Sequence, residues 1–344
     1  MSHCRTLKLL AAALCLSLLA LAPAQAKEVV KFAQANQFRL LGYGTEHVGV
    51  YPFLGVLQYY MQLPEIKGKY EFKHVGNVYK SPNECLTAVA SGAVQISYSG
   101  PAFLEQFNPN WKAASAPGIF EDFEHFQRTV DTPPWQKMVR ELEEKQNIKI
   151  IKWIGSLGSF MLFTNKPIHK VEDVAGLRIR YNGATGYAAA LGKFRTTPVA
   201  LPFTEVVSAL QTNMIDGLIS EIQAAPWYDL PRYAKNLVPI TWVSSPMCLI
   251  VNAKWWNSLD KDSKEIFTYA LMTPSTYQFL DADEARQIEE WGTVTPNTWK
   301  SSLSPEETRR WKELLHEAGA EFVKGVPAEL LEAAEACRPA SPAS

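Results

Sequence analysis

The segment that most constrains the fold runs from Gly176 to Gly217. It opens with a short apolar strand that ends in Arg180, continues through a helical stretch at residues 204–212, and returns to an apolar segment at residues 215–219. Strand, helix and strand in succession are typical of an α/β unit with a parallel sheet. An arginine at the end of such a strand can hold a carboxylate through two charge-assisted hydrogen bonds. Because no catalytic set surrounds it in the sequence, we interpret the chain as a carboxylate-binding protein rather than an enzyme.

A similar alternation precedes this segment. Residues 29–33 and 94–98 have the composition of short strands, and residues 81–91 between them have helical character. Ser81 as the cap, with proline at the first helical position and Glu84 three residues after the cap, is a strong helix start. The chain therefore contains at least two α/β units.

The remaining segments extend this pattern. A helical stretch is expected from Lys261 to about Trp291, with Pro274 ending or kinking it. Another helix is expected to begin at Ser304, which is followed by proline and then by a capping-box glutamate. The tail, residues 338–344, is rich in proline, alanine and serine and is expected to be disordered. Further strands are expected at residues 70–74, 148–154, 160–164, 238–243 and 248–252.

The first 26 residues have the three parts of a secretory signal peptide. Arg5 and Lys8 supply positive charge, residues 9–21 form an apolar core, and Ala24-Gln-Ala26 is a small-residue cleavage site. The apolar core, about 13 residues long, is too short to span a bilayer comfortably. We therefore expect a periplasmic protein of the 318 residues that remain when 26 are removed from 344.

Composition argues against nucleic acid as a partner. Without Arg5 and Lys8 of the leader, 32 basic residues face 35 acidic ones, and no basic run contradicts this balance. The cysteines of the mature chain, Cys85, Cys248 and Cys337, are odd in number and widely spaced, so they form neither a disulfide framework nor a metal motif. The sequence leaves open whether one pair forms a disulfide.

The order and spacing of several segments resemble the solute-binding proteins of tripartite ATP-independent periplasmic (TRAP) transporters, of the dicarboxylate-binding (DctP) type. The similarity covers nearly the whole mature chain and is clearest from Val171 to Arg180. The other matching segments are residues 84–92, 116–123, 167–168, 198–199, 203–206, 209–211, 216–217 and 250–252, with Trp256 and Leu259.

The resemblance implies an α/β periplasmic-binding-protein fold with two lobes, a cleft between them and a long helix spanning both. Carried onto this chain, residues 27–157 plus 245–283 would form lobe I, and residues 158–244 plus 284–337 would form lobe II. The family's carboxylate clamp would fall on Arg180. The resemblance also implies no cofactor and no chemistry on the ligand.

Two departures from the family pattern bear on the ligand. Many members carry a second arginine 20 residues before the clamp, where this chain has Phe160, and an asparagine where this chain has Ser220. A dicarboxylate would then leave one buried charge poorly paired. A monocarboxylate with an apolar or aromatic body fits better, because Phe160 could pack against it.

Other candidate ligand-binding residues stand at strand ends or in loops. Polar groups at the carboxyl ends of strands are where open α/β sheets place their ligands. No paired histidine spacing indicates a metal site. Beside Arg180 and Phe160, the candidates are Ser220, Glu221, Ser99, Tyr98, Trp242, Trp227, His47 and Glu46, each of which also has an ordinary interpretation as a core, turn or cap residue.

The leading hypothesis is an extracytoplasmic receptor, expected to be a monomer, that binds a small organic acid and delivers it to a TRAP permease driven by an ion gradient. The alternatives are a receptor for a C4-dicarboxylate or a 2-oxo acid, and a sensory receptor of the same fold that signals to a membrane kinase. A secreted hydrolase or lyase would need a nucleophile, a base and an orienting group near Arg180, and the sequence offers no such set.

Overall fold

A computed structural model describes residues 27–33, 62–75, 78–79, 81–221, 230–272 and 299–339. The expected leader lies outside these ranges, as do residues 273–298, on which most of the helix expected around Pro274 falls. None of the helices in the described ranges is both long and apolar enough to cross a membrane.

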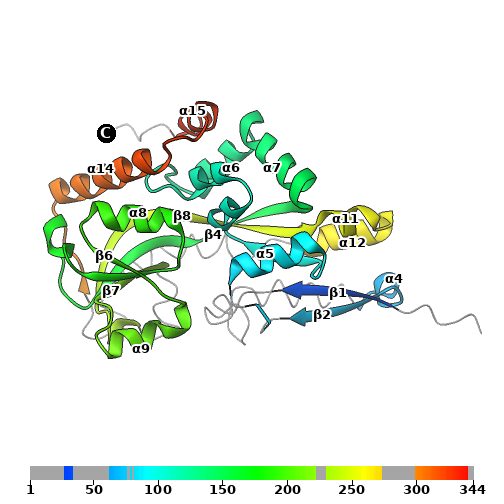
Figure 1. Cartoon of the computed structure of the whole chain (residues 1–344), viewed down its shortest axis with the longest axis horizontal. Coiled ribbons are helices and arrows are strands. Elements are labelled where there is room, and N and C mark those ends of the chain that lie inside the picture. The colour runs from blue at the N-terminus through cyan, green and yellow to red at the C-terminus, as the bar shows by residue number, and fades with distance from the viewer. Residues whose placement is uncertain are drawn as a thin grey trace, which may run out of the picture.

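Two long antiparallel strands, β4 (Ile148–Thr164) and β8 (Asn236–Asn252), join the two lobes (Figure 1). The strand order is β2-β1-β3-β8-β4-β7-β5-β6, so each lobe carries one end of a continuous mixed sheet, and the short β9 pairs with β8. The other strands are β1 (Glu28–Ala33), β2 (Tyr70–Val75), β3 (Ile96–Ser99), β5 (Arg178–Tyr181), β6 (Thr197–Ala200), β7 (Gly217–Glu221) and β9 (Trp299–Lys300).

The long strands correct one expectation. We expected strand ends near residues 155–159 and 244–247, where glycine, serine and proline interrupt the apolar pattern. In the structure these stretches pair with each other, Ser156 with Pro246 and Ser159 with Ser244, across several register shifts. Bulges of this kind bend a strand without ending it. The expected strand pairs are therefore two continuous strands that cross between the lobes.

Lobe I is built on β1, which pairs in parallel with β2 and β3. β2 is an edge strand of the sheet. Helix α5 (Pro82–Ser91) covers this sheet and begins as expected, because the Ser81 hydroxyl accepts a hydrogen bond from the Glu84 amide at 3.3 Å. The core between this helix and the sheet includes Phe32 of β1 and Leu86 and Val89 of α5.

Lobe II holds β5 between the parallel strands β6 and β7. Helix α8 (Thr185–Lys193) lies on one side of this sheet beside α14 (Pro305–Phe322), and α9 (Val206–Gln211) lies on the other (Figure 1). The core beneath α8 and α14 is aromatic. The Phe194 ring lies 4.7 Å from both Trp242 and Trp311, measured between ring centroids.

Helix α14 contacts both lobes. It is capped as expected, with the Ser304 hydroxyl accepting from the Glu307 amide at 3.1 Å. Trp311, near its start, packs into the core of lobe II, whereas Gly319, near its end, touches Pro117 of lobe I. The following helix, α15 (Ala328–Ala336), packs against α6 (Phe123–Val130) and α7 (Pro133–Gln146) of lobe I. The lobe boundaries given above remain our proposal. They assign α15 to lobe II, and this helix packs on the α6 and α7 helices of lobe I.

The remaining elements complete the lobes. Asp260 caps α12 (Lys261–Met272), because its carboxylate accepts from the Ser263 amide at 2.8 Å. The other α-helices are α4 (Pro64–Lys67), α6 (Phe123–Val130), α7 (Pro133–Gln146), α11 (Ala253–Ser258) and α12 (Lys261–Met272). The 3₁₀ helices are η2 (Pro101–Gln106), η3 (Pro109–Ser115), η4 (Val171–Val174), η5 (Phe203–Glu205) and η6 (Leu230–Arg232).

Candidate functional site

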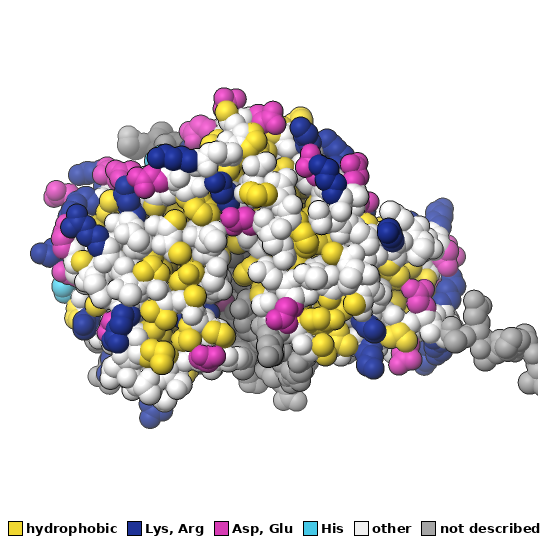
Figure 2. Space-filling view, viewed as in Figure 1, with side chains coloured by type: hydrophobic (Ala, Val, Ile, Leu, Met, Phe, Trp, Pro, Cys, Tyr) yellow, Lys and Arg dark blue, Asp and Glu magenta, His cyan; other side chains and the backbone are white. Residues whose placement is uncertain are grey.

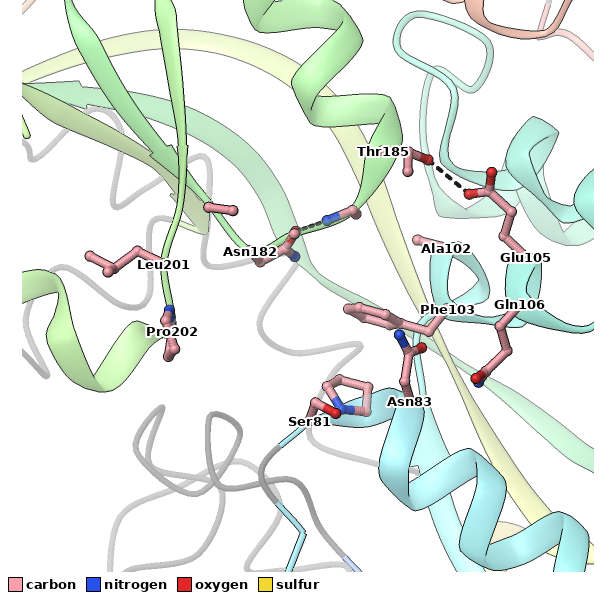
Figure 3. Close-up of a pocket in the computed structure, with 14 residues that line it drawn as sticks. Ser81, Asn83, Ala102, Phe103, Glu105, Gln106, Asn182, Thr185, Leu201 and Pro202 are labelled. Carbon is pink, nitrogen blue, oxygen red and sulfur yellow. Dashed lines mark hydrogen bonds between the residues drawn. The ribbon is translucent and has the colours of Figure 1, made fainter.

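A cleft of about 490 Å³ opens between the lobes (Figure 3). Lobe I lines it with the start of α5 and with η2. Lobe II lines it with the loop from β5 to α8 and with the chain that follows β6. The lining side chains include Asn83, Phe103, Glu105 and Gln106 from lobe I, and Asn182, Thr185, Leu201 and Pro202 from lobe II.

Two helices therefore begin at this cleft, one from each lobe. The first amides of a helix lack partners within it, and its dipole favours a negative charge at that end. The capping residue of α8, Ala184, offers no side-chain oxygen to these amides. Figure 2 shows the same face of the molecule, where most Lys, Arg, Asp and Glu side chains lie along the outer edge and uncharged atoms predominate beside the hollow between the lobes.

Arg180 lies directly behind one wall of the cleft. It is the next-to-last residue of β5, where it pairs with Val199 of β6 and Leu218 of β7, and it is only 2 % exposed. Its Nε donates to the carbonyl of the cleft residue Leu201 at 2.9 Å, and its guanidinium carbon lies 5.1 Å from the centre of the Phe203 ring. Within the described residues it makes no other hydrogen bond and no ion pair, so its two terminal nitrogens are left for another acceptor.

Burial lowers the pKa of Arg180 to about 10, and the nearby charge of Glu221 opposes this shift. The guanidinium therefore stays protonated at neutral pH. A buried cation without a paired anion is unfavourable, and a bound carboxylate would supply the missing partner.

The neighbouring Arg178 has a structural role. Its Nε and one terminal nitrogen donate to the two oxygens of Asp216 at 2.9 and 3.0 Å, and its amide donates to the same carboxylate. The Arg178 guanidinium holds the pKa of Asp216 below its usual range. A Cβ atom at the following residue, Gly217, would lie 2.2 Å from the carbonyl oxygen of Phe163. Asp216 thus fixes β5 beside β7, and Gly217 lets β7 pack closely on β4.

Ser220 and Glu221 end β7 and are both buried, as 0 % and 2 % exposure show. The Ser220 hydroxyl donates to one oxygen of Glu221 at 3.1 Å. The other oxygen, Oε1, has no hydrogen-bond partner in the described part of the chain. Burial raises the pKa of Glu221, while Arg180 lowers it. The structure therefore brings a buried acid into the electrostatic field of the buried arginine.

Phe160 lies on β4 opposite Glu221 of β7 and is 6 % exposed. Its ring stacks on Tyr187 of α8, with 5.2 Å between the centroids and 27° between the planes. This contact was missed by the sequence analysis, because nothing local to either residue indicates it. Phe160 is thus a buried residue beside Glu221, and its contact with a ligand stays a prediction.

The remaining candidates fall into two groups. Ser99 and Tyr98 are buried at the end of β3, where the Ser99 carbonyl accepts from the Cys248 thiol at 3.2 Å and the Tyr98 ring lies 5.9 Å from that of Phe32. Trp242 is fully buried between Phe194 and Trp311, so its contacts are those of a core residue and not of a cleft wall. Trp227, His47 and Glu46 lie outside the described residues.

Most of the residues that line the cleft were not predicted from the sequence, including Asn83, Glu105 and Thr185. The one available signal was the strong helix start at Ser81, which marks the edge of lobe I at the cleft. Among the described residues no group of three or more His, Cys, Asp or Glu side chains could hold a metal ion. Cys85, Cys248 and Cys337 are free thiols.

Comparison with known proteins gives a consistent result. The model of bacterial extracellular solute-binding protein family 7 (DctP) matches residues 65–325. The C4-dicarboxylate-binding periplasmic protein DctP of Vibrio cholerae is 22% identical over 257 residues, which cover 73% of this chain and 75% of that protein. The protein of the same name from Rhodobacter capsulatus is 24% identical, covering 75% and 78% of the two chains.

Solved structures share the fold at lower identity. A TRAP periplasmic solute-binding protein from Desulfovibrio desulfuricans, with bound sn-glycerol-3-phosphate, has a TM-score of 0.76 at 18% identity and covers 92% of this chain and 99% of its own. One from Shewanella oneidensis, with bound succinate, has a TM-score of 0.74 at 19% identity, with coverages of 91% and 99%. The two-lobed architecture matches that of these solute-binding proteins. Because the family match spans residues 65–325 of 344, the chain belongs to bacterial extracellular solute-binding protein family 7, whose members are receptors and not enzymes.

Proposed function

We propose that this protein is a periplasmic receptor that binds a small organic acid between its lobes and delivers it to a TRAP-type membrane permease. The observation that carries the proposal is Arg180, a buried cation with one backbone hydrogen bond and no ion pair among the described residues, placed behind the cleft wall at Leu201. The names of relatives support an acid as the ligand, since they include C4-dicarboxylate-binding and sialic acid-binding proteins.

The charge of the cleft favours a ligand with a single carboxylate. Among the described residues that line it, Glu105 is the only charged one. A second ligand carboxylate would therefore find no cation there and would be repelled by Glu105. The apolar lining, which includes Phe103, Leu201 and Pro202, suits an apolar or aromatic body. We propose a monocarboxylate with such a body as the ligand class.

The second candidate ligand is a C4-dicarboxylate, favoured by the names of the relatives from Vibrio cholerae and Rhodobacter capsulatus. A 2-oxo acid and a sensory role are further alternatives. In each case the ligand would contact both lobes only when the cleft is closed. It would then shift the balance between open and closed forms by its difference in affinity for the two.

A thermal-shift assay with matched pairs of acids separates these candidates. Each pair shares a body and differs by one carboxylate: benzoate with phthalate, and hexanoate with adipate. Ligand at about 100 times its Kd adds about 2.7 kcal/mol to the stability of the folded protein, which is readily seen as a rise in Tm. We expect the monoacid of a pair to give the larger rise. A larger rise with the diacid would show that residues beyond the described cleft supply a second cation.

The cellular parts of the proposal have their own tests. N-terminal sequencing of the protein from the periplasmic fraction should begin at Lys27, and an intact leader would contradict export by signal cleavage. Light scattering should give the mass of one chain, since we propose a monomer, and twice that mass would contradict it. Uptake of the ligand into vesicles that contain the permease should require this protein. If the protein were a sensory receptor, uptake would not depend on it.

A further inference from the structure

The lobes meet at a seam where backbone packs directly on backbone. On the side of lobe I the seam is the segment from Ser115 to Gly118, which leaves η3. On the side of lobe II it is Gly186 in the first turn of α8 and Gly319 near the end of α14. A Cβ atom at Gly186 would lie 2.5 Å from the carbonyl oxygen of Ser115, and one at Gly319 would lie 1.9 Å from that of Pro117.

No other residue type fits at these two glycines, because side-chain carbons do not approach a carbonyl oxygen within 3.0 Å. The lobe I side of the seam is also closely packed, at Gly118. A Cβ atom at Gly118 would lie 3.0 Å from the Cα atom of His316, and its backbone has a φ of +67°. Three glycines from three segments thus allow one close contact between the lobes.

Polar contacts hold the seam on both sides. The hydroxyl of Thr185, the residue before Gly186, donates to the Glu105 carboxylate of lobe I at 2.8 Å (Figure 3). On the other side the Lys112 ammonium of lobe I donates to the carbonyl of Lys324 at 2.7 Å and lies 5.9 Å from the centre of the Phe322 ring. These contacts fix the start of α8 and the end of α14 against lobe I.

The seam borders the candidate ligand site. Thr185 and Glu105 both line the cleft, and α8 follows closely on β5, which carries Arg180 near its end. A shift of the seam would therefore move the lobe II wall of the cleft relative to the lobe I wall. Because the seam lies beside the cleft, a small separation there becomes a larger change at more distant points of the two lobes.

We infer that this seam sets the angle between the two lobes, and that Gly186 and Gly319 are positioning residues for the cleft. The inference rests on the proposed function in one respect, namely that the ligand binds between the lobes and therefore depends on the angle between them. A methyl group at Gly186 must move from 2.5 Å to at least 3.4 Å from the Ser115 oxygen, the start of ordinary contact. The lobes would then separate at the seam while each lobe kept its own core.

The test compares Gly186→Ala with Gly192→Ala in the same helix, where a Cβ atom would have nothing within 4 Å. Spin labels on Thr87→Cys in α5 and Ser208→Cys in α9, both exposed, report the distance between the lobes. The background is the mature protein with Cys337→Ser, in which Cys85 and Cys248 are buried. No ligand is added, so the result does not depend on what Arg180 binds.

We expect Gly186→Ala to shift or broaden the distribution of distances between residues 87 and 208, with an unchanged circular-dichroism spectrum, and Gly192→Ala to leave the distribution unchanged. Identical distributions in the two variants would overturn the inference. If Gly186→Ala does not fold, the pair Glu105→Gln and Thr185→Val decides instead. Thr185→Val has no hydroxyl to donate, so it removes the hydrogen bond between the lobes without disturbing the backbone contact and should broaden the distribution. Glu105→Gln keeps an acceptor oxygen and should change the distribution less, and no change in Thr185→Val would count against the seam.

Discussion

The aromatic core of lobe II gives a prediction whose size can be worked from the structure. Phe194 directly follows α8 as its capping residue, is 2 % exposed, and lies between two tryptophan rings. Its ring centroid is 4.7 Å from that of Trp242, at an angle of 36°, and 4.7 Å from that of Trp311, at 32°. The same residues hold α8 and α14 on the sheet, so they support the helix that borders the cleft.

The substitution Phe194→Leu keeps most of the buried apolar volume and removes both ring contacts. Each aromatic pair contributes about 0.5–1.5 kcal/mol beyond its buried area. We therefore expect Phe194→Leu to lower the free energy of unfolding by about 1–3 kcal/mol. Phe194→Ala also leaves a cavity and should lower it by about 3–5 kcal/mol.

Urea unfolding followed by tryptophan fluorescence and circular dichroism measures these differences. The control is Met214→Leu, at a side chain that is 55% exposed, for which we expect a change within about 0.5 kcal/mol. The reasoning would be refuted if Phe194→Leu were no less stable than the control. It would also be refuted if the leucine and alanine variants at this position were equally destabilised. The cavity left by alanine would then add nothing to the loss of the ring contacts.

Three further predictions concern a buried acid, a helix cap and the thiols. Since burial raises the pKa of Glu221 above its ordinary value of 4.5, the folded state binds this proton more tightly and stability falls as pH rises from there. Glu221→Gln should therefore gain in Tm over the natural protein as the pH rises above 4.5, and a pH-independent difference would contradict this. Ser304→Ala removes the cap of α14 and should lower the free energy of unfolding by about 1 kcal/mol in chemical denaturation, whereas no loss would show that the cap is dispensable. Burial raises the pKa of Cys85 and Cys248 to about 12, so a thiol reagent should modify Cys337 first in the native protein, and equal rates would argue against the burial of the other two.

Features encoded in neighbouring residues could be predicted from the sequence. The starts of α5 and α14 depend on a serine, a proline and a glutamate within four residues, and both caps form as expected. The position of Arg180 close to the end of a strand also followed from the local apolar pattern, and the strand runs one residue further, to Tyr181. Its role as the ligand's partner remains our proposal.

Features that depend on distant partners could not be predicted in this way. The middle of β4 looks like a loop in sequence, because its glycines and serines are kept in the strand only by pairing with residues of β8. Trp242 was expected beside the cleft, but Phe194 and Trp311 enclose it from helices elsewhere in the chain. The contact of Thr185 with Glu105 joins residues 80 positions apart, in different lobes.

The central claim is that Arg180 holds the carboxylate of the ligand. We would titrate the acid that gives the largest thermal shift into the natural protein, Arg180→Ala and Arg180→Lys by calorimetry, after checking each fold by circular dichroism. Removing one partner of a buried charge pair costs about 2 kcal/mol or more, which is at least about a 30-fold rise in Kd. We expect that loss in Arg180→Ala and a smaller one in Arg180→Lys, which keeps the charge without the two-pronged geometry. Equal affinity in the natural protein and Arg180→Ala would contradict the account.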